Sequence, residues 1–554
     1  MNTDRSSNPA TTQANNLAST LVGAFVSASR NYDLRPPDYR SYEASFFVLD
    51  SWRFTPKLTV IYGGRYDLFT PFTEARNSVS NFNFFKALGS TSASVGSVIE
   101  AANVNGVNGN AGIKTDYSNF APRVGFAYSA TPKIVVRGGY GLSFFPGNYS
   151  SAAALKNAPF VLVYNPTCLS HIAYQIEVQQ GLNPKNIAPD CATVPGGATT
   201  FDQGLPLPAA QSITSPALSF VAEAPNFRSA MMQQFNLQVE QQIGANVLTM
   251  GYVGNLGQHL PEALNNINVP QPDDPANVST ARPLSTLLPN LGTEAYLQSE
   301  GVSNYNALQA SLQRRFTHGL AFDLNYTWAK ALSDITGFLE TGTQGYSNAN
   351  PYQIRQIEYG VAENEIANRF VLSGIYAEQY GKEFKGLKKF ALAAWEANVI
   401  WLWQSGHPFS IVNNGNGPGG YSNRATPRNN GGPDRPNQIH SANLAHKTLQ
   451  QSFDVTAFQA QPLGTIGTTQ RNILFGPHFR NADVSIFKNF PVTERLTVQF
   501  RTESFNISNT PNFFENNSNR NGNTQFGSSS FGKINQTDPN YNPRQLQFAL
   551  KAMF

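Results

Sequence analysis

The chain has 554 residues, of which 13% are charged and 12% aromatic, and its formal net charge is only +4. A positive charge this small and this dispersed excludes a protein whose main partner is nucleic acid. No stretch reaches the roughly 18–20 consecutive apolar residues of a transmembrane helix, which excludes a helical membrane protein; a membrane β-barrel stays open, because its strands need only ~9–11 alternating residues.

The N-terminal residues 1–16 predict a disordered segment ahead of one large domain at 17–554. They contain no apolar core behind a basic start, so no signal peptide is visible. That is unexpected for an exported protein.

Alternation with a period of two residues dominates the rest of the chain. The clearest case runs from Asn304 to Lys330, where apolar and polar side chains alternate on both sides of a turn at Thr317-His318-Gly319. Because successive side chains of a strand point to opposite faces, each such strand has one apolar and one polar face. We count about fourteen segments of this kind, at 19–28, 41–54, 57–69, 121–130, 133–145, 228–243, 246–256, 304–316, 319–331, 367–379, 390–404, 479–490, 494–507 and 543–554.

The connections between these segments alternate in length. The short ones lie at 55–56, 131–132, 244–245, 317–318 and 491–493, with one of moderate length at 380–389. The long ones are rich in Asn, Gly, Ser and Pro and lie at 70–120, 146–227, 257–303, 332–366, 405–478 and 508–542. This alternation predicts an all-β, antiparallel up-and-down transmembrane β-barrel, with short periplasmic turns and long extracellular loops.

Two cysteines, Cys168 and Cys191, lie in one of the long connections. In an oxidising periplasm or outside the cell we expect them to form a disulfide, which would stabilise the loop by about 3 kcal/mol. The alternative is a pair of free thiols in a loop.

The last strand ends the chain on an aromatic residue. One face of it is apolar and ends in the terminal Phe, which is the form of the signal by which outer-membrane barrels are recognised for insertion; ordinary alternation in a last strand is the alternative. We therefore expect the barrel-assembly machinery as a partner. The residues of this signal are Leu546, Phe548, Leu550, Ala552 and Phe554.

Several blocks of the sequence resemble the barrel of Oar-like TonB-dependent receptors. They include Tyr39–Asp67, Asn304–Lys330, Gly476–Asn481 and Phe500–Asn506, and the resemblance runs over about residues 17–554. It implies import or exchange of bulky solutes across the outer membrane, driven through TonB. In such receptors a plug fills a barrel of about 22 strands.

This chain departs from that pattern because it shows no signal peptide, no plug and fewer strands. It is then either a truncated or split receptor, or a reduced barrel that works without a plug. TonB is accordingly expected as a partner only if a plug is supplied elsewhere.

No constellation of residues indicates an enzyme. The seven histidines are scattered, and no HExxH, GxSxG or Walker motif occurs, so we predict no catalytic, cofactor or metal site. Polar side chains on the inner stripes would line a lumen, with hydrogen bonding to water and neighbouring strands as their ordinary role and solute selection as the alternative. The residues of this lining are Gln313, Asp323, Asn325, Gln499, Arg501 and Glu503.

The sequence therefore predicts an outer-membrane barrel that contacts lipid and mediates uptake or passage of an unidentified solute. A plugless passive pore is one alternative. A surface adhesin or structural barrel with a sealed lumen, a non-functional receptor fragment, and a soluble β-sandwich or propeller are the others.

Overall fold

One large β-sheet and the segments that connect its strands make up the computed structural model. The structure describes residues 21, 30–33, 37–90, 98–147, 151–157, 159–164, 169, 171–179, 190, 218–264, 266–268, 282–288, 291–335, 354–378, 383–413, 435–462, 465–493, 495–513 and 523–554. The predicted disordered segment 1–16 lies outside these residues, so it stays a prediction.

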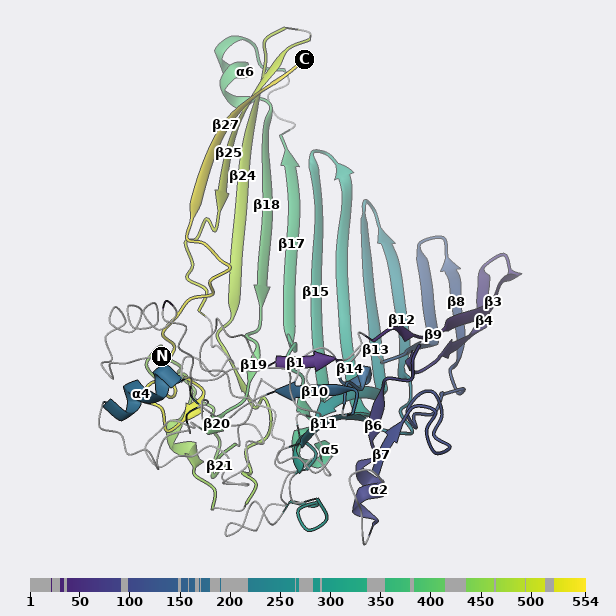
Figure 1. The fold of residues 1–554 in the computed structure, drawn as a ribbon. Coiled ribbons are helices and arrows are strands. Elements are labelled where there is room, and N and C mark those ends of the chain that lie inside the picture. The colour runs from purple at the N-terminus through teal and green to yellow at the C-terminus, as the bar shows by residue number, and fades with distance from the viewer. Residues whose placement is uncertain are drawn as a thin grey trace.

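The sheet has 15 strands, and thirteen of them follow one another in chain order, each antiparallel to the next (Figure 1). These are β3 (Glu43–Thr55), β4 (Leu58–Phe69), β8 (Phe120–Thr131), β9 (Ile134–Phe145), β12 (Ala230–Ile243), β13 (Asn246–Leu264), β14 (Leu291–Thr317), β15 (Leu320–Ser333), β17 (Asn368–Ala377), β18 (Trp395–Gln404), β24 (Phe479–Pro491), β25 (Thr497–Phe505) and β27 (Gln545–Met553). Two short strands join at the side: β11 (Leu218–Glu223) pairs in parallel with β14, and β16 (Gly360–Val361) pairs with β15. The up-and-down order confirms the predicted topology.

Thirteen of the fourteen predicted segments are strands of this sheet. The exception is 19–28, which lies outside the described residues apart from Leu21, and Leu21 is helical and exposed. The predicted strand 390–404 was wrong at its start, because Gly386–Leu392 forms the helix α6 and β18 begins only at Trp395. β13 and β14 are longer than predicted, since they continue to pair far into the connection predicted as loop.

Short and long connections alternate as the sequence predicts. Two-residue turns join β3 to β4, β8 to β9, β12 to β13 and β14 to β15. In the last of these, His318 (φ 52°) and Gly319 (φ 80°) are both left-handed, the conformation that matches the twist of a tight hairpin. The short turns and α6 lie at one end of the sheet, and the long connections lie at the other (Figure 1).

The register carries one polar and one apolar face across all thirteen strands. Directly paired residues of antiparallel strands point to the same side, and one such row runs from Gln313 through Asp323, Ser373 and Ile400 to Asp483. We call the side of this row the polar face. The opposite, apolar face carries most of the exposed large apolar side chains, which are Phe46, Val48, Trp52, Tyr62, Val124, Phe126, Tyr128, Tyr140, Leu237, Val239, Ile243, Met250, Tyr252, Leu308, Trp328, Tyr376, Trp395, Trp401, Ile486, Leu546, Phe548 and Leu550.

The separation of the two faces is not complete. Exposed apolar side chains also lie on the polar face, at Phe47, Leu49, Ile61, Ile375 and Ile400. The sheet also has two edges within the described residues, because β3 pairs only with β4 and β27 only with β25. The two edge strands lie at opposite ends of the sheet (Figure 1).

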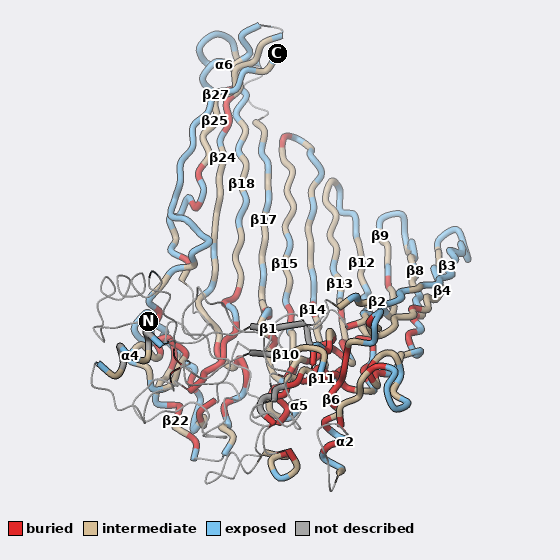
Figure 2. The backbone as a smooth tube through the Cα atoms, in the orientation of Figure 1, coloured by how far each residue is buried: buried red, intermediate tan, exposed pale blue. Residues whose placement is uncertain are grey.

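The long connections pack into a layer with its own apolar interior. We call the described parts of 70–119, 146–229, 258–302, 334–367, 405–478 and 506–544 the loop layer. Figure 2 shows that the buried residues gather here, while the strands are mostly intermediate or exposed. Three buried apolar clusters form around Phe82 and Phe220, around Ile113 and Leu297, and around Phe453 and Phe458. The described parts of the long connections are therefore packed against one another.

Short elements build this layer, and two from the N-terminal part of the chain, β1 (Arg30–Asp33) and β2 (Tyr39–Arg40), pair with strands of it. The others are β5 (Thr73–Glu74), β6 (Ser80–Phe82), α2 (Phe84–Leu88), β7 (Ile99–Ala101), η1 (Ser151–Ala154), β10 (Val161–Tyr164), α4 (His171–Gln179), α5 (Ile354–Glu358), β19 (Pro408–Phe409), β20 (Val412–Asn413), β21 (Asn437–Gln438), η5 (Val455–Ala457), β22 (Phe458–Gln459), β23 (Leu474–Phe475) and β26 (Gln525–Phe526). No helix in the described part of the chain is long and apolar enough to cross a membrane.

Candidate functional site

The six residues predicted to line a lumen all lie on the polar face, in two groups. Gln313 pairs with Asp323 across β14 and β15, and Asn325 Nδ2 donates to Asp323 Oδ1 at 3.0 Å. The other group is on β25, where the Arg501 guanidinium lies 4.1 Å from the centre of the Phe487 ring. β17, β18 and β24 separate the groups, so the structure brings them to one face and not to one site. Their role as a lining stays a prediction.

Two ion pairs on the same face were missed from the sequence. Arg65 Nε lies 2.7 Å from Asp67 Oδ1 within β4, and Arg137 Nη1 lies 3.1 Å from Glu240 Oε2 between β9 and β12. The period-two alternation was the signal that could have found them, because all four residues share the parity of the polar face. The polar face therefore carries paired charges as well as amides and hydroxyls.

Where β13 and β14 leave the spanning sheet, irregular pairing creates a polar cavity of about 600 Å³. The register shifts twice, between Gly257 and Leu260 and again between Leu260 and Glu262, and His259, within the first shift, adopts a left-handed φ of 53°. Bulges of this kind redirect side chains and are common beside functional sites. The polar cavity is lined by Phe85, Ala224, Asn226, Arg228, Gln258, His259, Glu262, Tyr296, Gln298, Ser299, Glu300, Val302, Asp334, Arg355 and Gln356.

Charges of both signs line the polar cavity. Arg355 Nε lies 3.6 Å from Asp334 Oδ2, and its Nη2 donates to the Glu300 carbonyl oxygen at 2.9 Å. Deeper in the wall, Gln298 Nε2 donates to Glu262 Oε2 at 2.8 Å. Both arginine side chains of the lining are about half exposed or more, whereas Asp334 and Glu262 are buried. The cavity thus presents guanidinium groups over buried carboxylates.

Burial changes the ionisation of two groups in this cavity. It raises the pKa of Asp334 above its ordinary value, against the opposing effects of the Val302 amide and Arg355. It lowers the pKa of His259, and the nearby Arg228 guanidinium lowers it further. His259 is therefore a neutral hydrogen-bonding group at neutral pH.

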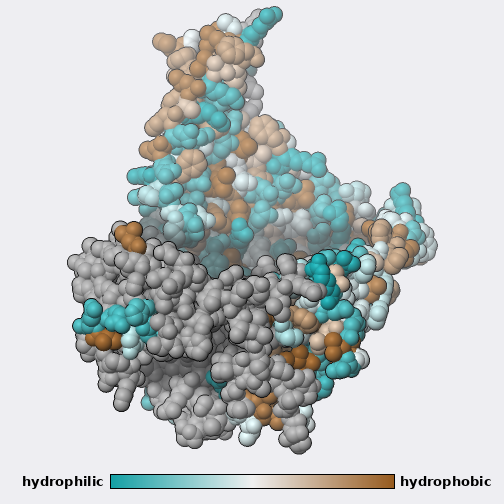
Figure 3. All heavy atoms as spheres, in the orientation of Figure 1, coloured by the Kyte–Doolittle hydropathy of each residue, from teal (hydrophilic) through white to brown (hydrophobic). Residues whose placement is uncertain are grey.

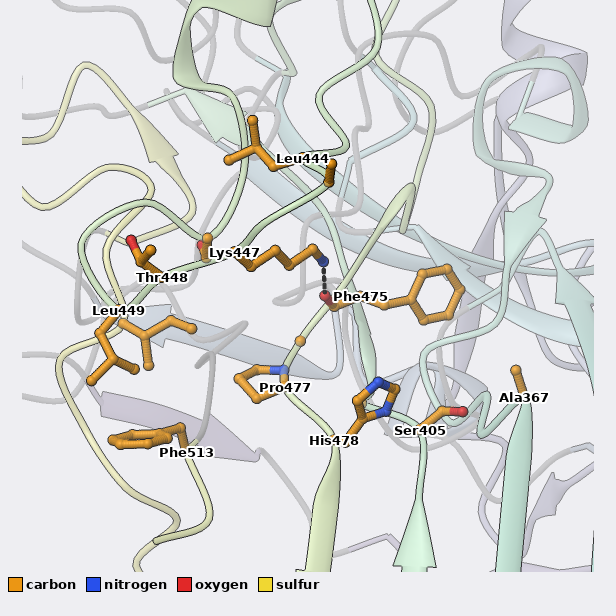
Figure 4. Close-up of a pocket in the computed structure, with 15 residues that line it drawn as sticks. Ala367, Ser405, Leu444, Lys447, Thr448, Leu449, Phe475, Pro477, His478 and Phe513 are labelled. Atoms are coloured by element: carbon orange, nitrogen blue, oxygen red, sulfur yellow. Dashed lines mark hydrogen bonds between the residues drawn. The ribbon is translucent and has the colours of Figure 1, made fainter.

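A second, mostly apolar cavity of about 750 Å³ lies where β18 and β24 enter the loop layer (Figure 4). Lys447 is the cation in its wall, and Figure 4 shows this side chain crossing the cavity so that Nζ donates to the Phe475 carbonyl oxygen at 3.0 Å. Because Lys447 Nζ already donates to this carbonyl oxygen and the rest of the lining is mostly apolar, the cavity suits an apolar group rather than an ion. The lining residues include Leu444, Leu449, Phe475, Pro477, His478, Phe513 and Ile534.

The comparison with protein families identifies what kind of domain carries these cavities. A family model described as an outer membrane beta barrel domain matches residues 1–547. The chain belongs to this family. The barrel domain is therefore an outer-membrane protein and not an enzyme. No curated protein sequence matches it significantly.

Three solved structures similar to the barrel domain are much longer than it. The outer membrane transporter YddB from Escherichia coli has 8% identity and a TM-score of 0.43, over 93% of this chain and 45% of that chain. The ferripyoverdine receptor of Pseudomonas aeruginosa has 11% identity and a TM-score of 0.38, over 93% and 39%. The ferric-catecholate import receptor Fiu from E. coli has 11% identity and a TM-score of 0.37, over 93% and 45%. The chain spans less than half the length of each.

The predicted insertion signal lies on an edge strand of the barrel domain. Leu546, Phe548, Leu550 and Ala552 share the apolar face of β27, and the terminal Phe554 follows it, exposed. Recognition by the barrel-assembly machinery stays a prediction.

Cys168 and Cys191 lie outside the described residues, so their disulfide also stays a prediction. Their described neighbours Leu169 and Asp190 form an isolated parallel β-bridge, and His171 Nδ1 lies 2.6 Å from Asp190 Oδ2. Among the residues that the structure describes, no group of three or more His, Cys, Asp or Glu side chains could hold a metal ion.

Two carboxyl groups are buried on opposite faces of the small sheet that β11 forms with β14. Glu294 lies on the side of Tyr296 and the Phe220 cluster, and neither of its carboxylate oxygens has a hydrogen-bond partner among the described residues. Glu223 lies on the other side, near Phe227. Burial raises the pKa of Glu223 to about 8 and that of Glu294 well above its ordinary value.

We expect the loop layer to lose stability as pH rises. Each carboxyl is protonated in the folded layer up to a higher pH than in the unfolded chain. The contribution of each carboxyl to the stability of the loop layer is therefore complete below pH 4.5, the ordinary pKa of a glutamate. It is lost progressively as pH rises from there through the pKa in the folded layer, which is about 8 for Glu223. Each carboxyl contributes about 1.4 kcal/mol per pH unit within its window. Pulse proteolysis of the loop layer in urea, repeated across this range, measures the slope.

The matched variants are Glu223→Gln and Glu294→Gln, which keep the shape and cannot ionise. Each should flatten the pH dependence and raise the stability at pH 8. A slope that neither variant changes would show that other groups cause it.

Proposed function

We propose that the barrel domain provides a path for a solute across the outer membrane along its polar face. The observation that carries this proposal is the register, which places most of the amide, hydroxyl and charged side chains of the strands on one side of the sheet. Side chains of that kind, facing away from lipid, stabilise water and hydrated solutes.

The polar cavity is the first point of contact in this proposal. It lies at the long-loop end of β13 and β14, which is the extracellular end. A solute would meet the guanidinium groups of Arg228 and Arg355 in the loop layer before it reached the polar face. Uptake driven through TonB belongs to the proposal only for an assembly in which a plug fills the barrel.

Solute flux into vesicles that contain the purified chain tests the proposal. Asn325→Trp places a bulky ring on the polar face, so it should reduce the flux of a small sugar several-fold. Tyr326→Trp, the next residue and on the apolar face, should leave flux unchanged. No flux above protein-free vesicles, or an equal effect of both variants, would contradict the proposed path.

A further inference from the structure

The helix α6 exposes apolar side chains at the short-turn end of the sheet. It occupies the connection between β17 and β18, and Leu387, Phe390 and Leu392 are 85%, 62% and 54% exposed. Figure 3 shows apolar side chains gathered at this end. Contiguous exposed apolar surface usually marks a contact with another molecule or a membrane.

The helix is continuous with the apolar face of the sheet. The Phe390 ring lies 4.9 Å from the Phe490 ring, and Trp395 Nε1 donates to the Ala391 carbonyl oxygen at 2.9 Å. Phe490 and Trp395 both lie on the apolar face. α6 therefore extends the apolar face rather than the polar one.

Lys488 fixes this junction. Its Nζ donates to the Ala393 carbonyl oxygen just beyond the helix, and it lies 5.0 Å and 5.6 Å from the centres of the Trp395 and Phe490 rings. Lys488 is only 3% exposed, so its ammonium group holds the end of α6 against the aromatic side chains at the strand end and does not itself reach a lipid headgroup.

The spacing of tryptophans on β18 places α6 at the level of the lipid headgroups. Trp395 and Trp403 lie on the same face near opposite ends of the strand. At about 3.4 Å per residue they are about 27 Å apart along the strand. A strand tilt of about 35–45° makes this about 19–22 Å of height, close to the ~25 Å apolar band between the two aromatic girdles of an outer-membrane barrel. α6 adjoins Trp395, at the periplasmic girdle.

Positive charge accompanies the apolar residues. Lys385, Lys388 and Lys389 are all exposed on or beside the helix, and Glu383 is the acidic group nearest to them in sequence. A short helix with exposed apolar residues and several lysines is suited to lie in the plane of an anionic membrane surface. We infer that α6 docks in the periplasmic headgroup layer and binds anionic phospholipid.

An environment-sensitive fluorophore on α6 tests the inference. Leu387→Cys, in a Cys168→Ser, Cys191→Ser background, is labelled with a nitrobenzoxadiazole dye, and the full chain is inserted into phosphatidylcholine vesicles with or without phosphatidylglycerol. We expect blue-shifted emission that is quenched by lipids spin-labelled near the headgroup. Ala245→Cys, in a two-residue turn at the same end of the sheet, is the matched control, and the dye there should show the emission typical of a water-exposed position. Heat-modifiable migration on gels verifies that each variant folds.

Variants that remove the lysine charges distinguish anionic lipid from other partners. In phosphatidylglycerol vesicles at low salt, each of Lys385→Gln, Lys388→Gln and Lys389→Gln should weaken docking roughly fivefold, and high salt should reduce the difference. Emission from position 387 that matches the Ala245 control in every vesicle would overturn the inference. So would quenching that depends neither on phosphatidylglycerol nor on the lysines, because anionic lipid would then not be the partner.

Discussion

Replacing Arg435 with alanine is expected to destabilise the loop layer by about 3–5 kcal/mol. Arg435 Nη1 lies 2.9 Å from Glu358 Oε2, and the two side chains are 3% and 0% exposed. The same guanidinium donates to the Thr469 and Ile357 carbonyl oxygens, both at 2.9 Å. The alanine variant leaves the Glu358 carboxylate buried without the Arg435 guanidinium, and the buried Thr469 carbonyl and the partly buried Ile357 carbonyl each lose a donor.

This pair also holds two long connections together. Glu358 belongs to α5, between β15 and β17, whereas Arg435 lies between β18 and β24. Arg471 and Asn472 link the same two connections, since Arg471 Nη1 donates to the Ile335 carbonyl oxygen and Asn472 Nδ2 to that of Val361. Loss of Arg435 should therefore loosen both connections together.

Pulse proteolysis in urea measures the change in free energy of unfolding. The matched control is Arg40→Ala, which breaks an exposed pair with Asp38 at 3.3 Å and should cost at most about 1 kcal/mol. Arg435→Met combined with Glu358→Leu should recover much of the loss, because it removes both charges and refills the space. An Arg435→Ala variant as stable as Arg40→Ala would show that the ion pair contributes little.

The strands could be predicted because the alternation of apolar and polar residues is visible within each strand's own sequence. In Asn304–Lys330 the alternation and the turn at Thr317-His318-Gly319 specify two strands and their faces, and the structure reproduces both. A one-residue slip would exchange the two faces, so the pattern fixes the register strongly. At α6 the local pattern gave the wrong result, since a short helix with apolar residues on several sides cannot be told from a strand by periodicity alone.

The loop layer could not be predicted, because its contacts join residues that are distant in sequence and follow no period. Asn157 illustrates this: its side chain donates to the Ser80 and Val221 carbonyl oxygens and accepts from the Val221 amide. The polar cavity depends on the double register shift beside His259, and the alternation of apolar and polar residues does not predict this shift. By contrast, the common face of Gln313, Asp323 and Glu503 follows from parity, and it was predicted.

The second large effect concerns the two faces of β14. Ala310→Arg should destabilise the barrel domain by about 2–4 kcal/mol, the cost of a charged side chain near the midplane on a lipid-facing position. Ala310 pairs with Met250 and Tyr326, both on the apolar face. Ser311→Arg should cost much less, because the adjacent side chain points to the polar face, where it pairs with Thr249 and Asn325.

The two variants isolate the effect of lipid contact because Ala310 and Ser311 differ mainly in the face of the sheet to which their side chains point. Both native side chains are small, and both lie in the middle of the spanning part of one strand, so neither variant leaves a cavity or disturbs a turn. Unfolding by guanidinium in lipid vesicles, followed by tryptophan fluorescence, gives both free energies. If the two arginine variants were equally stable, or if Ser311→Arg were the worse, lipid would not cover the apolar face, and the polar face could not be the path of a solute.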